Sequence, residues 1–389
     1  MTGRAVGAPD VVVVGAGPAG ATAALALARG GVRVLIVERR SLPRDKTCGG
    51  GVVSRAFGAL PRGLDLPVER RVARVESRFV DAGATVVVQR HEPLVHLATR
   101  AALDLALVEA ARAAGAELRA GVAVQRIESR ADHLAVETSA GPIRARWVVG
   151  ADGATGATAR AAGWATAPPL APALEAEIAV PPAVLDRHAD RARFDLGFPP
   201  GGYGWVFPKA ARLSVGVGVF ARPGGRPRLR DELARYLRAL GLPDPGRHVH
   251  GAPIPVRPRP GGAARGRVLL VGDAAGLADP LTGEGISLAI RSGGLAGAAL
   301  LTADLDAEAG RRAYTSRLER EILRELRIAR ALAWVLYRRR GLVRRLVPRL
   351  GAAAGQALGD VVAGRRTYRD IVRRPGAWRR LLTALVGAA

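Results

Sequence analysis

The chain has 389 residues, of which 49% are hydrophobic, and a net charge of +25. This length exceeds what one hydrophobic core usually supports, so we expect more than one domain. A single cysteine excludes a disulfide framework, a cysteine-ligated zinc site and an iron–sulfur cluster, and it fits a reducing cytoplasm. We expect no metal site.

The first forty residues predict a strand, a helix and a second strand. Asp10–Val14 is a β-branched run typical of a buried strand, and an Ala- and Leu-rich helix follows to about Arg29. Val32–Val37 predicts the second strand, which closes with Glu38 and runs parallel to the first. The uncharged run Val11–Ala28 has glycines spaced for a turn, which argues against a signal peptide or a membrane span.

Strand and helix patterns continue along the chain. They predict strands within 72–90 around a turn at 81–83, a helix at 100–114, strands within 117–149, a proline-rich passage at 168–182, antiparallel strands at 193–220, a proline-rich return at 253–260, a buried strand at 268–271 and a helix at 283–301. From Ala307 the pattern is helical and basic, with 20 Arg against 5 acidic residues from Arg311 onward. Nucleic acid and an anionic membrane surface both fit this charge, and charge alone does not choose between them.

The turn after the first strand fits the dinucleotide-binding fingerprint. In Gly15-Ala16-Gly17-Pro18-Ala19-Gly20, the first glycine permits the tight turn and the second lets the backbone approach a pyrophosphate. The third lets the helix pack closely on the strand. The phosphates are expected at the helix N-terminus, and Glu38 is placed to accept hydrogen bonds from ribose hydroxyls. The sequence therefore predicts a nucleotide site.

Two later strand ends indicate which nucleotide is bound. One strand runs into Asp152-Gly153 and another into Gly272-Asp273. Together with the fingerprint, these motifs resemble the p-hydroxybenzoate hydroxylase superfamily of flavoproteins. The resemblance implies that FAD is the cofactor, that Asp273 binds its ribitol chain, and that Arg100 lies near it.

The segment Pro280–Ile286 is predicted to open a helix. A helix N-terminus carries a partial positive charge, which would stabilise an anionic reduced flavin placed against it; the alternative is an ordinary helix start. The complete predicted set of cofactor contacts is Gly15, Gly17, Pro18, Ala19, Gly20, Glu38, Arg39, Arg100, Val124, Asp152, Gly272, Asp273, Gly283, Gly285 and Ile286.

Two further motifs narrow the resemblance. Pro43–Gly51 reads Pro-Arg-Asp-Lys-Thr-Cys-Gly-Gly-Gly, and Tyr203–Lys209 reads Tyr-Gly-Trp-Val-Phe-Pro-Lys with Gly216 beyond it. Both look like the geranylgeranyl reductase family, whose YxWxFPK pattern is met without departure. The resemblance spans roughly residues 9 to 300 and implies that the chain reduces carbon–carbon double bonds of isoprenoids.

The residue types of these motifs suit such a reaction. Tyr203, Trp205 and Phe207 alternate, so on a strand they point to one face, either as the wall of a site for a long apolar substrate or as an ordinary core face. Lys209 either holds a diphosphate or polar head or pairs with an acid. Cys48 either directs a proton at the flavin face or is a small buried residue. The predicted catalytic set is Cys48, Gly49, Gly50, Tyr203 and Trp205, and the predicted substrate set is Tyr203, Trp205, Phe207 and Lys209.

The expected fold is α/β, with a Rossmann-like FAD-binding domain, an inserted antiparallel β-sheet substrate domain and a C-terminal helical region. The boundaries that we predict are 1–75, 95–165 and 262–306 for the first, 76–94 and 166–261 for the second, and 307–389 for the third.

The leading hypothesis is an FAD-dependent reductase of isoprenoid double bonds. An FAD-dependent monooxygenase acting on a lipophilic or aromatic substrate is the alternative. A nucleic-acid-binding protein would leave the flavin motifs without purpose, so no nucleic-acid partner is expected. NAD(P)H and an electron-donor protein such as ferredoxin both remain open as the source of electrons. We expect a cytoplasmic protein. Its basic helices either attach it to the inner face of an anionic membrane or cap a domain with solvated faces.

Overall fold

Val11–Val14 (β1) lies inside a six-stranded sheet in the computed structural model, which describes residues 8–61, 63–221 and 228–373. The order is β18-β19-β12-β1-β2-β8, and the strands from β19 to β8 run parallel. The other strands are Val34–Glu38 (β2), Glu117–Ala120 (β8), Trp147–Gly150 (β12), Ala264–Arg265 (β18) and Val268–Leu270 (β19). All four valines of β1 are buried, as expected of a central parallel strand covered on both faces.

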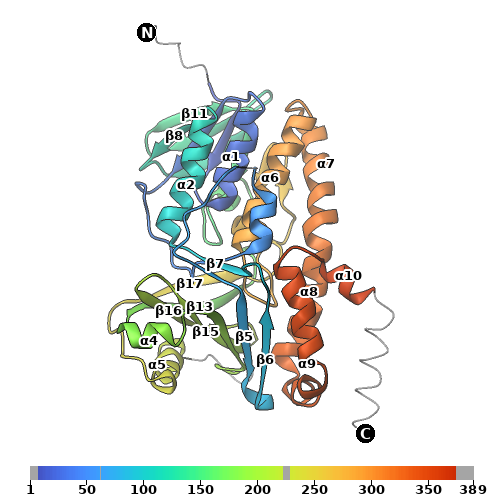
Figure 1. The fold of residues 1–389 in the computed structure, drawn as a ribbon. Helices are drawn as coiled ribbons and strands as arrows, with labels where there is room; N and C mark the ends of the chain where they lie inside the picture. The colour runs from blue at the N-terminus through green and yellow to red at the C-terminus, as the bar shows by residue number, and fades with distance from the viewer. Residues whose placement is uncertain (1–7, 62, 222–227, 374–389) are drawn as a thin grey trace.

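Helices pack tightly beside this sheet. Helix α1 (Pro18–Arg29) contacts both α2 (Arg100–Ala113) and α6 (Ile286–Thr302), and α7 (Ala307–Leu318) follows α6 (Figure 1). A Cβ atom at Gly293 of α6 would lie 2.1 Å from the Ala19 carbonyl oxygen of α1. The two helices therefore approach each other at backbone distance.

A seven-stranded sheet forms the other end of the molecule (Figure 1). Its order is β17-β13-β16-β15-β14-β5-β6, and every pair is antiparallel except β14 with β5. The strands are Arg74–Phe79 (β5), Ala84–Gln89 (β6), Leu170–Ala179 (β13), Arg191–Leu196 (β14), Gly202–Pro208 (β15), Arg212–Val219 (β16) and Val249–Pro255 (β17). The antiparallel strands within 193–220 and the strands around 81–83 are confirmed. The start of the proline-rich return at 253–260 is instead the end of β17, an edge strand, where proline is tolerated.

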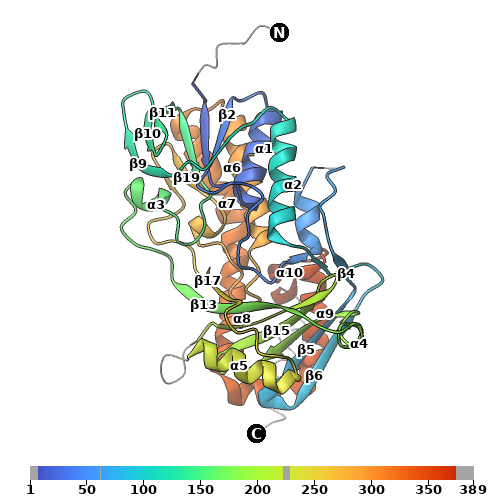
Figure 2. The same cartoon turned by 90° about the vertical axis from the view of Figure 1, so that its left-hand side faces the viewer.

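Smaller elements complete the fold (Figure 2). One three-stranded sheet has the order β3-β7-β4 and lies between the two large sheets; another has the order β11-β10-β9. Their bounds are Gly51–Val53 (β3), Arg70–Val72 (β4), Val95–Leu97 (β7), Val124–Ser129 (β9), Leu134–Thr138 (β10) and Gly141–Ala145 (β11). The short helices are Ser54–Ala59 (η1), Val80–Ala82 (η2), Thr158–Ala161 (α3), Pro182–Asp186 (α4), Leu229–Leu240 (α5) and Gly272–Ala275 (η3).

The basic C-terminal region is helical, as predicted, through its described part. A π-helical turn at Glu319–Leu323 (η4) leads into α8 (Arg324–Arg338), α9 (Arg340–Val362) and α10 (Tyr368–Val372). Helix α9 packs on β6, and a Cβ at Gly355 would lie 2.5 Å from Val86 Cγ1. Residues 374–389 lie outside the described residues. Across the described ranges, no helix is long and apolar enough to span a membrane.

Candidate functional site

The turn between β1 and α1 has the geometry that its glycines predict. Gly15 has a φ of +104°, and a Cβ there would lie 2.6 Å from the Ala151 carbonyl oxygen. A Cβ at Gly20 would lie 2.0 Å from the Gly15 carbonyl oxygen. Both positions therefore require glycine, one for its backbone conformation and the other for close packing of α1 on the turn.

Charged side chains surround the N-terminus of α1. Glu38 ends β2, as predicted, and its carboxylate accepts a hydrogen bond from the Ala16 N–H at 2.9 Å. A Cβ at Gly17 would meet the guanidinium groups of Arg44 at 3.6 Å and Arg100 at 3.8 Å. Asp104 accepts two hydrogen bonds from Arg100, at 2.8 and 2.7 Å, and pairs with Arg44 at 3.2 Å. Two cations thus face the point where a pyrophosphate is expected. Arg44 belongs to the Pro43–Gly51 motif, but no cofactor contact was predicted for it.

A cavity of about 1590 Å³ begins at this turn and continues to the C-terminal helices. Ligand sites are usually about 300–1000 Å³, so this cavity has room for a dinucleotide and a second molecule. The predicted cofactor residues that line it are Gly15, Gly17, Pro18, Ala19, Glu38, Arg39, Arg100, Val124, Asp152, Asp273, Gly283, Gly285 and Ile286. Gly20 and Gly272 do not line the cavity but allow close packing next to it. Gly20 lies against the Gly15 carbonyl oxygen and Gly272 against Ala19.

These residues fit a bound FAD. The buried Oδ1 atom of Asp152 has no hydrogen-bond partner among the described residues, while its Oδ2 accepts from the Thr158 N–H at 2.8 Å. Burial raises the pKa of Asp152. Asp273 pairs with Lys46 at 3.2 Å and lines the same cavity. The carboxyl groups of Asp152 and Asp273 therefore provide acceptors for hydroxyl groups of FAD, and the two arginines at Gly17 provide positive charge for its phosphates.

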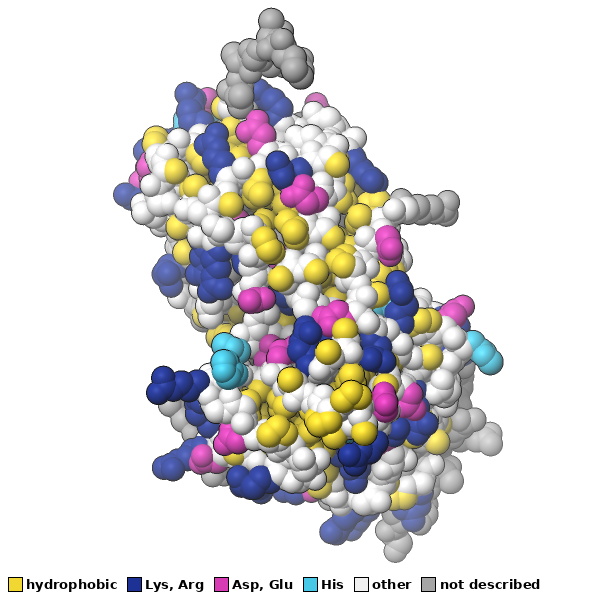
Figure 3. All heavy atoms as spheres, turned by 60° about the vertical axis from the view of Figure 1, so that its left-hand side comes forward, with side chains coloured by type: hydrophobic (Ala, Val, Ile, Leu, Met, Phe, Trp, Pro, Cys, Tyr) yellow, Lys and Arg dark blue, Asp and Glu magenta, His cyan; other side chains and the backbone are white. Residues whose placement is uncertain are grey.

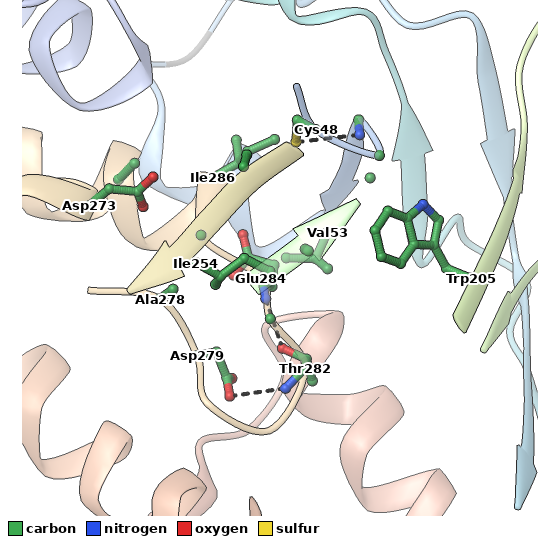
Figure 4. Close-up of a pocket in the computed structure, with 18 of the residues that line it drawn as sticks. Cys48, Val53, Trp205, Ile254, Asp273, Ala278, Asp279, Thr282, Glu284 and Ile286 are labelled. Carbon is green, nitrogen blue, oxygen red and sulfur yellow. Dashed lines mark hydrogen bonds between the residues drawn. The ribbon is translucent and has the colours of Figure 1, made fainter. Parts of the chain in front are cut away.

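The segment from Cys48 to Gly51 lies against the aromatic strand. A Cβ at Gly49 would be 2.9 Å from Trp205 Nε1 and 3.1 Å from the Phe207 ring. Gly50 has a φ of +74°, and its Cβ would lie 2.1 Å from the Ala98 carbonyl oxygen. Figure 4 shows Cys48 between Trp205 on one side and Asp273 with Ile286 on the other. The glycines therefore bring backbone, rather than side chains, to this part of the cavity.

The alternating aromatic residues of β15 share one face, as predicted. Tyr203, Trp205 and Phe207 are buried and line the cavity. The Phe194 ring packs edge-to-face on Tyr203 at 5.6 Å and on Phe207 at 5.3 Å between centroids. Phe220 stacks between Tyr203 and Tyr337 of α8, each at 5.1 Å. This aromatic wall therefore borders the cavity, and its outer end is tied to the C-terminal region.

Acidic residues on β13 complete the floor beneath Cys48. The Cys48 N–H donates to Glu175 Oε1 at 2.7 Å, and burial raises the pKa of Glu175 to about 7. Lys209 is buried and forms an ion pair with Glu177. Lys209 was predicted either to hold a diphosphate or polar head or to pair with an acid, and in the structure it pairs with an acid. Sequence reasoning missed both glutamates, although two acids at alternate positions of an otherwise apolar strand were a signal.

The loop before α6 corrects one prediction. The helix begins at Ile286, so Pro280–Gly285 is a loop and not the first turn of a helix. Three tyrosines hold this loop. Tyr203 donates to the Thr282 carbonyl at 2.6 Å and Tyr337 to the Leu281 carbonyl at 2.5 Å, while Tyr368 of α10 donates to Asp279 at 2.8 Å. Helices α8 and α10 therefore fix the approach to the N-terminus of α6.

The C-terminal helices also line the cavity, a role that the sequence did not indicate. Cavity-lining side chains on α8 and α9 are Leu332, Val335, Leu336, Leu342, Val343, Leu346, Val347, Leu350, Leu358 and Val362. Opposite them lie Val75, Val86 and Val88 of the β5–β6 pair. The far part of the cavity is thus an apolar chamber between a sheet and basic helices. On the face shown in Figure 3, Arg and Lys side chains stand in several separate groups rather than in one continuous patch.

Residues 8–186 match the family described as FAD binding domain. Digeranylgeranylglycerophospholipid reductase 1 of Methanopyrus kandleri is 35% identical, over 84% of this chain and 90% of the relative. Chloroplastic geranylgeranyl diphosphate reductase of Oryza sativa subsp. japonica is 32% identical, over 84% of this chain and 75% of the relative. The chain belongs to the geranylgeranyl reductase family. A third relative, menaquinone reductase of Mycolicibacterium smegmatis, is 31% identical over 84% of each chain.

Solved structures share the fold of this geranylgeranyl reductase family member. A geranylgeranyl bacteriochlorophyll reductase-like protein from Thermoplasma acidophilum has a TM-score of 0.74 at 23% identity, covering 91% of each chain. The p-nitrophenol 4-monooxygenase PnpA of Pseudomonas putida has a TM-score of 0.72 at 21% identity, covering 92% of this chain and 98% of its own. These structures confirm the expected α/β fold. The family to which the chain belongs makes it an FAD-dependent oxidoreductase.

Proposed function

We propose that this protein reduces carbon–carbon double bonds in the isoprenoid chain of a prenyl diphosphate, a prenyl lipid or a prenylquinone. The observation that carries the proposal is the course of the cavity. It leads from the dinucleotide turn, past the aromatic wall of β15, into an apolar chamber lined by α8 and α9. A long apolar substrate can be buried there while one of its double bonds lies beside Cys48 and Trp205. The names of the relatives, which include a geranylgeranyl diphosphate reductase, a digeranylgeranylglycerophospholipid reductase and a menaquinone reductase, support the same substrate range.

Several residues around the cavity would take part in this reaction. FAD, once reduced, supplies the hydride. Arg44 and Arg100 would hold its diphosphate at Gly17, Glu38 would accept hydrogen bonds from its ribose hydroxyls, and Asp273 would bind its ribitol chain. The N-terminus of α6, which begins later than predicted, would stabilise negative charge on a flavin ring placed against it. Trp205 and Phe207 hold the isoprenoid chain and exclude water.

The test is mass spectrometry of prenyl substrates after incubation with chemically reduced, FAD-loaded protein. Geranylgeranyl diphosphate, a geranylgeranylated glycerolipid and menaquinone are offered separately. We expect product that has gained two hydrogens per reduced bond. Product that has gained one oxygen, formed only in air, would instead support the monooxygenase alternative, which the fold shared with PnpA keeps in view. Running the same assay with NADPH, NADH or reduced ferredoxin in place of the chemical reductant distinguishes the candidate electron donors.

We further propose that α8 attaches the protein to an anionic membrane surface. Leu332 and Trp334 are exposed, and the Arg339 guanidinium lies 4.3 Å from the centre of the Trp334 ring. Leu332 also lines the cavity, so this helix has a side chain that is both exposed and in contact with the chamber. Aromatic and basic side chains together suit the interfacial zone of a bilayer. An isoprenoid substrate could pass from the bilayer into the chamber along this edge.

We expect the protein to co-sediment with anionic liposomes, to bind less at high salt, and to bind several-fold less after Trp334→Ala. Salt acts because exposed charges are screened within about 10 Å at 0.1 M. Leu170→Ala is the matched control, since this exposed apolar side chain lies on β13, away from α8. Equal recovery with neutral and anionic vesicles at low salt would contradict the proposal.

A further inference from the structure

Glu175 is a buried acid without a counter-ion of its own. Glu175 and Glu177 alternate on β13, so their side chains lie on the same face, toward the cavity. Glu177 binds both Lys209 and Arg212, the latter at 2.8 Å. Glu175 accepts one hydrogen bond, from the Cys48 N–H, and its buried Oε2 has no hydrogen-bond partner in the described part of the chain. A buried oxygen in this state favours the neutral, protonated carboxyl group.

The cations around Glu175 are already engaged by other acids. Arg100 is bound by Asp104, and Lys209 by Glu177. Burial is therefore the largest influence on the pKa of Glu175 and raises it. The Cys48 hydrogen bond, Lys209 and Arg100 lower this pKa by less. The charged and titratable groups around Glu175 are Cys48, Arg100, Glu177, Lys209 and, on the neighbouring strand, His250. Arg212 is paired with Glu177.

The sheet places Glu175 between solvent and the reacting region. Glu175 pairs with Gly216 on β16, and Gly216 pairs in turn with Trp205 on β15. A Cβ at Gly216 would lie 2.1 Å from Trp205 Cζ2, so the indole covers this glycine on the side of Glu175. On its other side Glu175 pairs with His250 of the edge strand β17, which is exposed and also lines the cavity. Residues paired in this way across antiparallel strands have neighbouring side chains on one face.

We propose that Glu175 is the general acid of the reduction, and this inference rests on the proposed function. Hydride from the reduced flavin forms one new C–H bond on the alkene. The O–H bond of Glu175 breaks as the second C–H bond forms on the neighbouring carbon. The alkene is thereby reduced and the flavin oxidised, and the carboxylate left on Glu175 regains a proton from water at the His250 side of the cavity. Cys48 then shapes the site through its backbone N–H, which orients the acid.

The first test compares turnover of pre-reduced wild-type protein and Glu175→Gln. Glutamine keeps an oxygen for the Cys48 N–H but carries no transferable proton, so we expect turnover to fall on the order of 10²–10⁴-fold with FAD still bound. Wild-type turnover should fall as pH rises through about 7, because the acid must be protonated. Glu175→Asp should keep this pH dependence at a reduced rate. Glu109→Gln, an exposed position on α2, is the control.

The second test needs neither FAD nor substrate, because Cys48 is the only cysteine of the chain. Ionised Glu175 disfavours the nearby thiolate, so above pH 7 iodoacetamide should alkylate Glu175→Gln faster than wild type. Wild type should show an additional inflection near pH 7 that the variant lacks. Unchanged turnover in Glu175→Gln, or identical alkylation profiles, would overturn the inference. If wild type reduces none of the prenyl substrates, the proposed function fails, and the alkylation profiles still decide whether Glu175 carries a proton near neutral pH.

Discussion

Gly17→Ala is expected to weaken FAD binding strongly while leaving the apoprotein folded. In the protein without cofactor, the added methyl group would meet only the guanidinium nitrogens of Arg44 and Arg100, at ordinary contact distances of 3.6 and 3.8 Å. That space is where the backbone must approach the FAD diphosphate. We expect a loss of affinity on the order of a hundredfold, or about 2.7 kcal/mol, measured by FAD fluorescence titration.

Gly20→Ala is the matched comparison on the same helix. Its methyl group would lie 2.0 Å from the Gly15 carbonyl oxygen, so the turn itself must move. This variant should lose FAD affinity and apoprotein stability together, as measured by thermal unfolding without cofactor. If Gly17→Ala binds FAD as wild type does, the diphosphate lies elsewhere and the placement of the cofactor is wrong.

The sequence was sufficient for the dinucleotide end of the protein because its constraints are local. A strand, a glycine turn, a helix and a strand ending in an acid follow each other within about thirty residues, and backbone sterics at Gly15 and Gly20 permit few alternatives. The common face of Tyr203, Trp205 and Phe207 was predictable for the same reason, since side chains alternate along any strand.

The rest of the site depends on contacts between distant segments. Glu175 reaches Cys48 across 127 positions of the chain, and no local pattern encodes that hydrogen bond. The later start of α6 depends on tyrosines from β15, α8 and α10 that hold the preceding loop. The basic C-terminal region was expected on a surface, yet the apolar side chains of α9 line the cavity, because the glycines facing β6 let the helix approach the sheet.

Asp104→Asn is expected to lower the free energy of unfolding of the apoprotein by about 3–5 kcal/mol, the usual cost of breaking a buried ion pair from one side. Asp104 is buried and neutralises two guanidinium groups, those of Arg100 and Arg44. Without its charge, the guanidinium groups of the buried Arg100 and the partly buried Arg44 face each other beside Gly17, with Glu38 as the other acid near them. Glu109→Ala on the same helix is the control. Its ion pair with Arg112 is half exposed, so we expect a change of roughly 0.5 kcal/mol or less in urea unfolding.

The FAD-loaded form of Asp104→Asn should lose less stability than the apoprotein. The diphosphate brings negative charge to the same two guanidinium groups, so it replaces part of what the carboxylate supplied. By thermodynamic linkage, a smaller loss of stability in the loaded form means that FAD binds the folded variant more tightly than it binds the folded wild type. Equal losses with and without FAD would show that Arg44 and Arg100 do not contact the diphosphate. Their position at Gly17 would then serve only to hold α2 against the dinucleotide turn.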